Sequence, residues 1–283
     1  MTRLFNTLIT APELRELLAT GPAPVVVDTG FDLADTEAGE RAWRAGHLPG
    51  SFYLHVDRDL SGEKTGHNGR HPLPDRAVFA ATLGRLGITP ARQVIALDRQ
   101  GGPYAARLWW LLRWMGHEAV AVLDGGVVAW TATGGALDTA EPAGSGAAPY
   151  PPRPALAGII DAAALGSELG RVRLIDARAG ERFRGEVEPI DAAAGHIPGA
   201  LNRFFKDNLG ADGRFKPAAA LRGEFELLLG RDAAADTVHQ CGSGVTACHN
   251  LLAMEHAGLV GSKLYPGSWS EWSSDPARPV ARG

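Results

Sequence analysis

The sequence predicts an α/β protein with two tandem domains, each a mainly parallel sheet covered by helices on both faces. Two observations carry this prediction. Short apolar runs alternate with amphipathic stretches, and landmarks of the first half recur in the same order in the second half. Apolar strands without polar alternation, separated by helices, are typical of parallel sheets buried on both faces. The recurrence indicates that one structural unit occurs twice.

Four landmarks define the repeat. Each half has an apolar strand that ends in Asp, then Ala-Gly-His-x-Pro-Gly, then a second strand followed by a helix, and last a glycine-containing turn followed by Trp. The matching segments are 25–28 with 173–176, 45–50 with 194–199, 94–98 with 238–241, and 122–130 with 264–272. Four landmarks in one order are hard to obtain by chance.

Local signals place the helices. Thr10 and Glu13 have the spacing of a capping box and predict a helix start, and Asp161 is expected to cap the equivalent helix of the second half. The helical patterns at 104–115 and 245–257 follow the second strand of each half.

A stretch dominated by Gly, Ala and Pro separates the two copies. Such a composition favours an extended, semi-rigid linker. We therefore expect an N-terminal domain over 1–140, a linker over 141–154 and a C-terminal domain over 155–283.

Composition excludes several classes of protein. Of the 283 residues, 32 are acidic and 28 are Lys or Arg. This charge balance does not favour binding to nucleic acid or to an anionic membrane. No apolar run reaches the length of a bilayer span, and the N-terminus lacks the apolar core of a secretory signal. With two cysteines there is no disulfide framework, so we expect a cytoplasmic protein.

The segment from Cys241 to Ala247 carries the strongest chemical signal. It joins the strand at 237–240 to a helix, at the carboxyl end of a parallel strand, where ligands bind in such sheets. Backbone N–H groups converge at a helix start and favour a thiolate, the nucleophilic form of cysteine. Cys248 instead lies within the helical pattern and is expected to be a small buried apolar residue.

These segments resemble the tandem-domain rhodanese-like sulfurtransferases along nearly the whole chain. The resemblance rests on the two His-x-Pro-Gly motifs, the Asp-Gly-Gly…Trp and Pro-Gly-Ser-Trp-Ser-Glu-Trp segments, the linker, and a cysteine loop in the second half only. The loop Cys-Gly-Ser-Gly-Val-Thr-Ala is similar to that of 3-mercaptopyruvate sulfurtransferases. The resemblance implies a catalytic second domain and a non-catalytic first domain, in which Asp98 replaces Cys241.

The resemblance implies a two-step reaction. Cys241 takes sulfur from a small-molecule donor and becomes a persulfide, which passes the sulfur to cyanide or to a thiol, including one on a thioredoxin-like protein. No cofactor or metal is required, because the persulfide itself carries the sulfur. Amides of the loop are expected to face this anionic sulfur. The residues concerned are Gly242, Gly244, Val245 and Thr246.

Side chains of the loop have expected roles as well. Ser243 is expected to donate a hydrogen bond to the leaving group or to carry a proton. Thr246 either binds the thiolate or supports the first turn of the helix. The two alternatives stay open for Thr246.

A donor with a carboxylate needs a cation. Arg182 matches the carboxylate-binding arginine of the family, and Arg184 is a weaker candidate. The mercaptopyruvate enzymes tend to carry a second arginine after a Glu-Pro pair, where this chain has Ile190 and Asp191. Ile190 cannot hold a carboxylate and Asp191 would repel one, so thiosulfate remains an alternative donor.

The histidines are weighed separately. His47 and Asp35 are candidates for a proton relay to the loop serine, as the resemblance implies. The position of His47 and His196 in the Ala-Gly-His-x-Pro-Gly turns favours a structural role for both. His67, Arg70 and His71 lie near no acid or cysteine cluster and are expected to form a solvated loop, not a metal site.

Two other classes of function compete. A cysteine phosphatase needs an arginine to bind phosphate at the end of the loop, where this chain has Ala247. A non-catalytic sulfur-binding or docking module would not need the intact cysteine loop.

Overall fold

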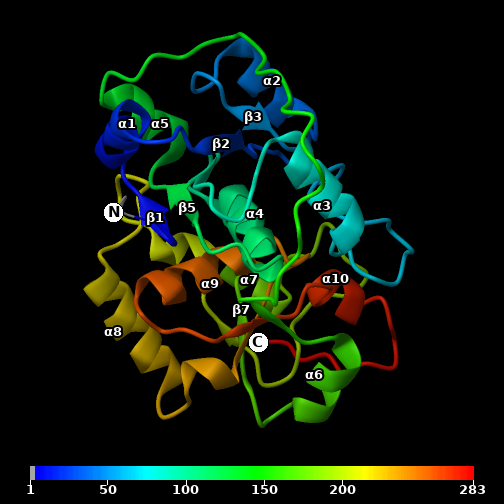
Figure 1. The fold of residues 1–283 in the computed structure, drawn as a ribbon. Coiled ribbons are helices and arrows are strands. Elements are labelled where there is room, and N and C mark those ends of the chain that lie inside the picture. The colour runs from blue at the N-terminus through cyan, green and yellow to red at the C-terminus, as the bar shows by residue number, and fades with distance from the viewer. Residues whose placement is uncertain (1–3) are drawn as a thin grey trace. The chain divides into compact units, whose positions relative to one another are not determined.

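A computed structural model describes residues 4–283 (Figure 1). Contacts divide the chain into two compact units. Unit 1 holds the described residues up to Ser61, Pro74–Leu156 and Ala211–Arg214, and unit 2 holds Gly62–Leu73, Ala157–Gly210 and Phe215–Gly283. Each unit therefore includes one short segment from the other half of the sequence.

Unit 1 contains one five-stranded, all-parallel sheet with the strand order β1-β5-β4-β2-β3. The strands are β1 (Leu8–Ile9), β2 (Val25–Asp28), β3 (Phe52–Tyr53), β4 (Val94–Leu97) and β5 (Val120–Leu123). The helices are α1 (Ala11–Thr20), α2 (Ala38–Ala45), α3 (Arg76–Arg85), α4 (Pro103–Trp114) and α5 (Gly126–Ala132).

Unit 2 repeats this topology, with the parallel order β6-β10-β9-β7-β8. Its strands are β6 (Gly158–Ile159), β7 (Arg173–Asp176), β8 (Leu201–Asn202), β9 (Thr237–Gln240) and β10 (Lys263–Leu264). Its helices are α6 (Ala162–Glu168), α7 (Gly180–Arg184), α8 (Ala218–Leu229), α9 (Ala247–His256) and α10 (Ser268–Trp272), with short 3-10 turns at Phe205–Asn208 and Ala234–Asp236. The identical strand order confirms the predicted duplication.

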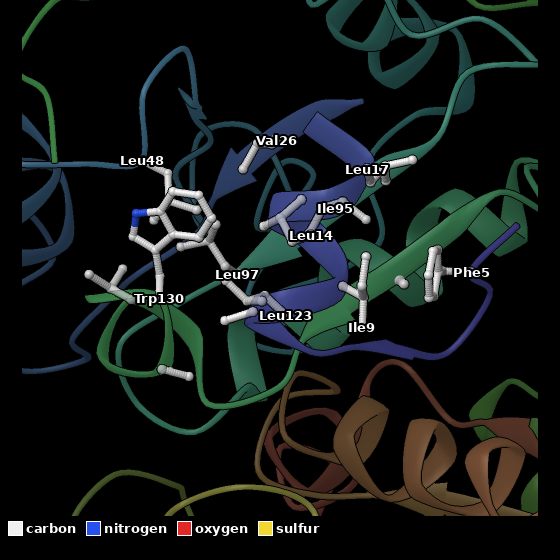
Figure 2. Close-up of a cluster of buried hydrophobic side chains, with 14 residues drawn as sticks. Phe5, Ile9, Leu14, Leu17, Val26, Leu48, Ile95, Leu97, Leu123 and Trp130 are labelled. Carbon is white, nitrogen blue, oxygen red and sulfur yellow. The ribbon is translucent and has the colours of Figure 1, made fainter. Parts of the chain in front are cut away.

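The alternating side chains of the strands build cores on both sheet faces. In unit 1, one face packs against α1 and α5, with Leu14 and Trp130 over Ile95 and Leu123 (Figure 2). In unit 2, Val238 of β9 faces a core that includes Leu165 of α6 and Trp269 of α10. His239 points to the opposite face, where its Nε2 lies 3.1 Å from the sulfur of Met254 on α9. The central strands β4 and β9 are buried throughout.

Both predicted helix caps are confirmed. Thr10 caps α1 in a capping box with Glu13, and the side chain of Asp161 accepts the amide N–H of Ala164 at the start of α6. The Gly-, Ala- and Pro-rich stretch runs along α3, where Tyr150 donates its backbone N–H to Ala80 O at 2.9 Å. Within residues 4–283, no helix is both long enough and apolar enough to cross a membrane.

Candidate active site

Cys241 lies at the carboxyl end of β9, the middle strand of its sheet, and just before α9. This is the predicted strand-loop-helix arrangement. Both cysteines are buried, and they form no disulfide. Cys248 lies within α9, where its thiol donates to Gly244 O at 3.3 Å, so it packs under the loop.

Helix α10 holds the backbone of the loop in place. The amide N–H of Cys241 donates to Ser268 Oγ at 3.1 Å. In the other direction, the N–H groups of Trp269 and Ser270 donate to Cys241 O and Gly242 O at 3.0 and 2.9 Å. The Pro-Gly-Ser-Trp-Ser motif noted in the sequence therefore fixes the first two residues of the cysteine loop.

Gly244 allows the loop to turn back on the sulfur. Its N–H donates to Cys241 Sγ at 3.2 Å, and such a donor stabilises negative charge on sulfur. Its φ is +76°, and a Cβ there would lie 2.3 Å from Pro266 O. Only glycine satisfies both conditions. Val245 is buried, and Thr246 is the N-cap of α9 without a capping hydrogen bond from its side chain.

Ser243 contacts a histidine for which the sequence predicted no role in the site. Its Oγ lies 2.7 Å from Nδ1 of His71, and both residues are buried. His71 belongs to Gly62–Leu73, the segment of the first half that is part of unit 2. The expectation of a solvated loop is therefore wrong for His71, although His67 is exposed.

Two guanidinium groups lie beside Gly242. A Cβ on Gly242 would be 3.0 Å from Nη2 of Arg70 and 3.6 Å from Nη1 of Arg182. Asp191 joins the two cations, with contacts of 2.5 Å to Arg70 and 2.9 Å to Arg182. Asp191 is thus paired with two cations and is not the isolated negative charge that the sequence suggested. Arg70, expected in a solvated loop, is also part of the site.

The ion pairs continue into the core of unit 2. Glu188 contacts Arg182 at 2.7 Å and Arg178 at 3.5 Å, and Arg178 in turn binds Asp176 at the end of β7. Burial raises the pKa of Glu188, but hydrogen bonds from Arg182 and from the backbone at Asp191 outweigh it and hold the pKa below its usual range. Glu188 therefore stays ionised and anchors Arg182 beside the loop.

The turn histidines are committed to the backbone. His47 places Nδ1 at 2.8 Å from Trp43 O and Nε2 at 3.2 Å from Ala140 O, and its ring stacks on Trp43. His196 has the same arrangement, with Nδ1 at 2.8 Å from Phe183 O and its ring stacked on Phe183. These contacts support the structural interpretation of both histidines.

The remaining candidates lie outside the cysteine loop. Asp35 is an exposed residue that pairs with Arg41, whereas His47 is fully buried, so the structure does not join Asp35 and His47 in a relay. Arg184 pairs with Glu186 at the surface of unit 2. Among the residues that the structure describes, no group of three or more His, Cys, Asp or Glu side chains could hold a metal ion.

In unit 1, Asp98 occupies the position of Cys241. It follows β4 as Cys241 follows β9, and its carboxylate accepts four backbone N–H groups. Complete burial raises the pKa of Asp98, and the four N–H groups oppose this shift. The loop after the central strand of unit 1 thus presents four N–H donors to the side chain at this position, although burial outweighs them and the pKa of Asp98 is raised.

Comparisons with known proteins agree with this architecture. The model of the rhodanese-like domain matches residues 10–133 and 161–275. A Pseudomonas aeruginosa protein named "Probable 3-mercaptopyruvate sulfurtransferase" is 47% identical over 98% of each chain. A Mycobacterium tuberculosis protein named "Putative thiosulfate sulfurtransferase SseB" is 40% identical, also over 98% of each chain.

A solved structure is similar as well. The 3-mercaptopyruvate sulfurtransferase from Leishmania major is 29% identical, with a TM-score of 0.83 over 95% of this chain and 74% of that chain. The chain belongs to the rhodanese-like family in its two-domain form, and it is a sulfurtransferase.

Proposed function

We propose that this sulfurtransferase takes sulfur from 3-mercaptopyruvate and holds it as a persulfide on Cys241. The observation that carries the proposal is the convergence of an N–H donor and two guanidinium groups on one cysteine loop. The amides stabilise a negatively charged sulfur, and a guanidinium fork suits a planar carboxylate. The P. aeruginosa relative named for this donor supports the choice.

In the first half-reaction the Cys241 thiolate attacks the donor sulfur. The carbon–sulfur bond breaks, a sulfur–sulfur bond forms, and the electron pair goes to the carbon that becomes the methyl group of pyruvate. The proton of the donor thiol ends on that carbon. We assign the transfer of this proton to Ser243, and its contact of 2.7 Å with Nδ1 of His71 supports this assignment. Cysteine persulfide and pyruvate result.

In the second half-reaction an acceptor attacks the outer sulfur and releases the Cys241 thiolate. With cyanide the product is thiocyanate, and with a thiol it is a new persulfide. A thioredoxin-like protein as acceptor and a cytoplasmic location are parts of the proposal that rest on the sequence.

Thiosulfate is the second candidate donor. The M. tuberculosis relative is named for it, and the two guanidinium groups beside Gly242 also suit the anionic SO3 group of thiosulfate. In that reaction the Cys241 thiolate takes the outer sulfur and sulfite leaves with the electron pair.

The experiment compares kcat/KM for 3-mercaptopyruvate and for thiosulfate, each with cyanide as acceptor, on one preparation. We expect 3-mercaptopyruvate to be preferred and Cys241→Ser to abolish both activities. The matched control is Cys248→Ser, which keeps a hydrogen-bond donor for Gly244 O. Equal activity in Cys241→Ser and Cys248→Ser would contradict the mechanism. A higher kcat/KM for thiosulfate would show that thiosulfate, and not 3-mercaptopyruvate, is the preferred donor.

A further inference from the structure

We propose that unit 1 carries a binding site for a small organic cation, an amine with an aromatic or apolar body, in a cleft between α2 and β3. The cleft has a volume of about 390 Å³, which is within the usual range for small-molecule sites. Three aromatic rings and three carboxylates are among its walls: Trp43, Phe52, Tyr53, Glu40, Asp59 and Glu141. All of these residues belong to unit 1, so the inference is independent of the chemistry proposed for Cys241.

Two of the aromatic rings are held in fixed positions. Trp43 stacks on His47 with ring centroids 4.3 Å apart, and its indole N–H donates to Ser51 O at 3.2 Å. The hydroxyl of Tyr53 donates to Gly30 O at 2.9 Å, and burial raises the pKa of Tyr53, so the phenol stays neutral. Aromatic rings attract cations through their faces, and rings that are already fixed lose little entropy when a ligand binds.

The ion pairs of the cleft disfavour an anionic ligand. Glu40 lies between two arginines and contacts Arg58 and, at 2.8 Å, Arg44. Arg44 also pairs with Glu141, and Arg58 lies 3.6 Å from Glu37. Both Nη atoms of each guanidinium group therefore face a carboxylate. An anion would have to compete with these acids for the arginines, at a cost in electrostatic energy.

Carboxylate oxygens remain for a cationic ligand. Oε1 of Glu141 accepts from Arg44, and Oδ2 of Asp59 accepts the backbone N–H of His55 at 2.8 Å. Within residues 4–283, Oε2 of Glu141 and Oδ1 of Asp59 accept no hydrogen bond. Hydrogen bonds from two arginines lower the pKa of Glu40, so this carboxylate is ionised as well.

The cleft thus combines aromatic walls with an excess of negative charge. Four carboxylates surround two guanidinium groups, and the four are Glu37, Glu40, Asp59 and Glu141. An ammonium group offers three N–H donors to the remaining carboxylate oxygens, and its apolar body suits the rings. A protonated amine therefore satisfies both features of the cleft.

The test titrates three probes of similar size into the full-length protein: benzylamine, benzyl alcohol and benzoate. Binding is followed by the indole N–H signal of Trp43 in ¹H–¹⁵N NMR spectra, which is assigned by its loss in Trp43→Phe. We expect benzylamine to bind at least about 5-fold more tightly than benzyl alcohol, and benzoate not to bind. Higher salt should weaken the binding of benzylamine alone.

Variants then locate the site. Glu141→Gln and Asp59→Asn each remove a negative charge, and the asparagine keeps an oxygen for the N–H of His55. Together they should weaken benzylamine binding about 5- to 10-fold and leave benzyl alcohol binding unchanged. The matched control is Glu118→Gln, an exposed acid of the same unit that does not line the cleft. Circular dichroism checks that each variant is folded, and Glu141→Gln alone decides if Asp59→Asn is not.

Three results would overturn the proposal. One is equal affinity for benzylamine and benzyl alcohol, and another is a tighter binding of benzoate than of benzylamine. The third is that the charge-removing variants bind benzylamine as Glu118→Gln does, because the amine would then bind elsewhere.

Discussion

Asp98→Asn tests whether the loop of unit 1 is built around an anion. In the structure, Oδ1 of Asp98 accepts the N–H groups of Gln100 and Gly102 at 2.9 and 2.8 Å. Oδ2 accepts those of Tyr104 and Ala105 at 2.9 and 3.1 Å. An asparagine presents one oxygen and one NH2 group, so two of the four backbone donors would face another donor. At roughly 1–3 kcal/mol for each unsatisfied buried donor, we expect a loss of about 2–6 kcal/mol in the free energy of unfolding.

Urea unfolding at pH 7, followed by tryptophan fluorescence and circular dichroism, measures this loss. Asp75→Asn is the matched control in the same unit. Asp75 caps α3 through Oδ1 alone, which accepts the N–H groups of Ala77 and Val78, and asparagine is an equally good N-cap. We expect Asp75→Asn to change stability by less than about 0.5 kcal/mol. A change that small in Asp98→Asn as well would refute the idea that its second oxygen is needed.

Three further predictions concern His239 and Gly244 of unit 2 and His47 of unit 1. Burial lowers the pKa of His239 to about 3 from 6.5, so the unfolded chain binds a proton between these values that the folded chain does not. This histidine should lower the free energy of unfolding by about 2 kcal/mol between pH 7 and pH 5. Urea unfolding of His239→Leu should show a smaller decrease over this pH range, and the same decrease in both proteins would contradict the prediction. Gly244→Ala should remove most sulfur transfer, because its Cβ would overlap Pro266 O; near-normal kcat would show that the loop shifts without cost. His47→Ala should lower the melting temperature and change kcat by less than about 2-fold relative to the unaltered enzyme. A loss of activity without a loss of stability would instead support the hypothesis that His47 takes part in a proton relay.

The sequence predicts the parts of the site that are local in the chain. The strand before Cys241, the helix after it and the turn through Gly244 follow from residues within a few positions of one another, and the caps at Thr10 and Asp161 are equally local. Periodicity, glycine and capping signals act over such distances, so these elements are confirmed.

The sequence does not predict the contacts that bring distant segments together. Ser243 and His71 are separated by 172 positions, and Arg70 and Asp191 by 121. Nothing in the pattern of Gly62–Leu73 says that it packs in the unit of the other half. For the same reason Asp191 looks like an isolated repulsive charge in the sequence, whereas two cations neutralise it in the fold. The signal that could have been used is the combination of Arg and His beside glycines in a loop, since such a loop can present both side chains to a neighbouring site.

The two units allow the contributions of fold and side chain to be separated. In both, the residue after the central strand meets backbone N–H groups: a carboxylate at Asp98 and a thiol at Cys241. A carboxylate is a poor nucleophile toward sulfur and a thiolate is a strong one. The topology therefore brings backbone N–H donors to this position in each unit, and the proposed mechanism assigns the reactivity to the cysteine. The segment Gly62–Leu73 brings His71 and Arg70 beside the second loop, so under the proposed mechanism a few side chains distinguish two units of the same strand order.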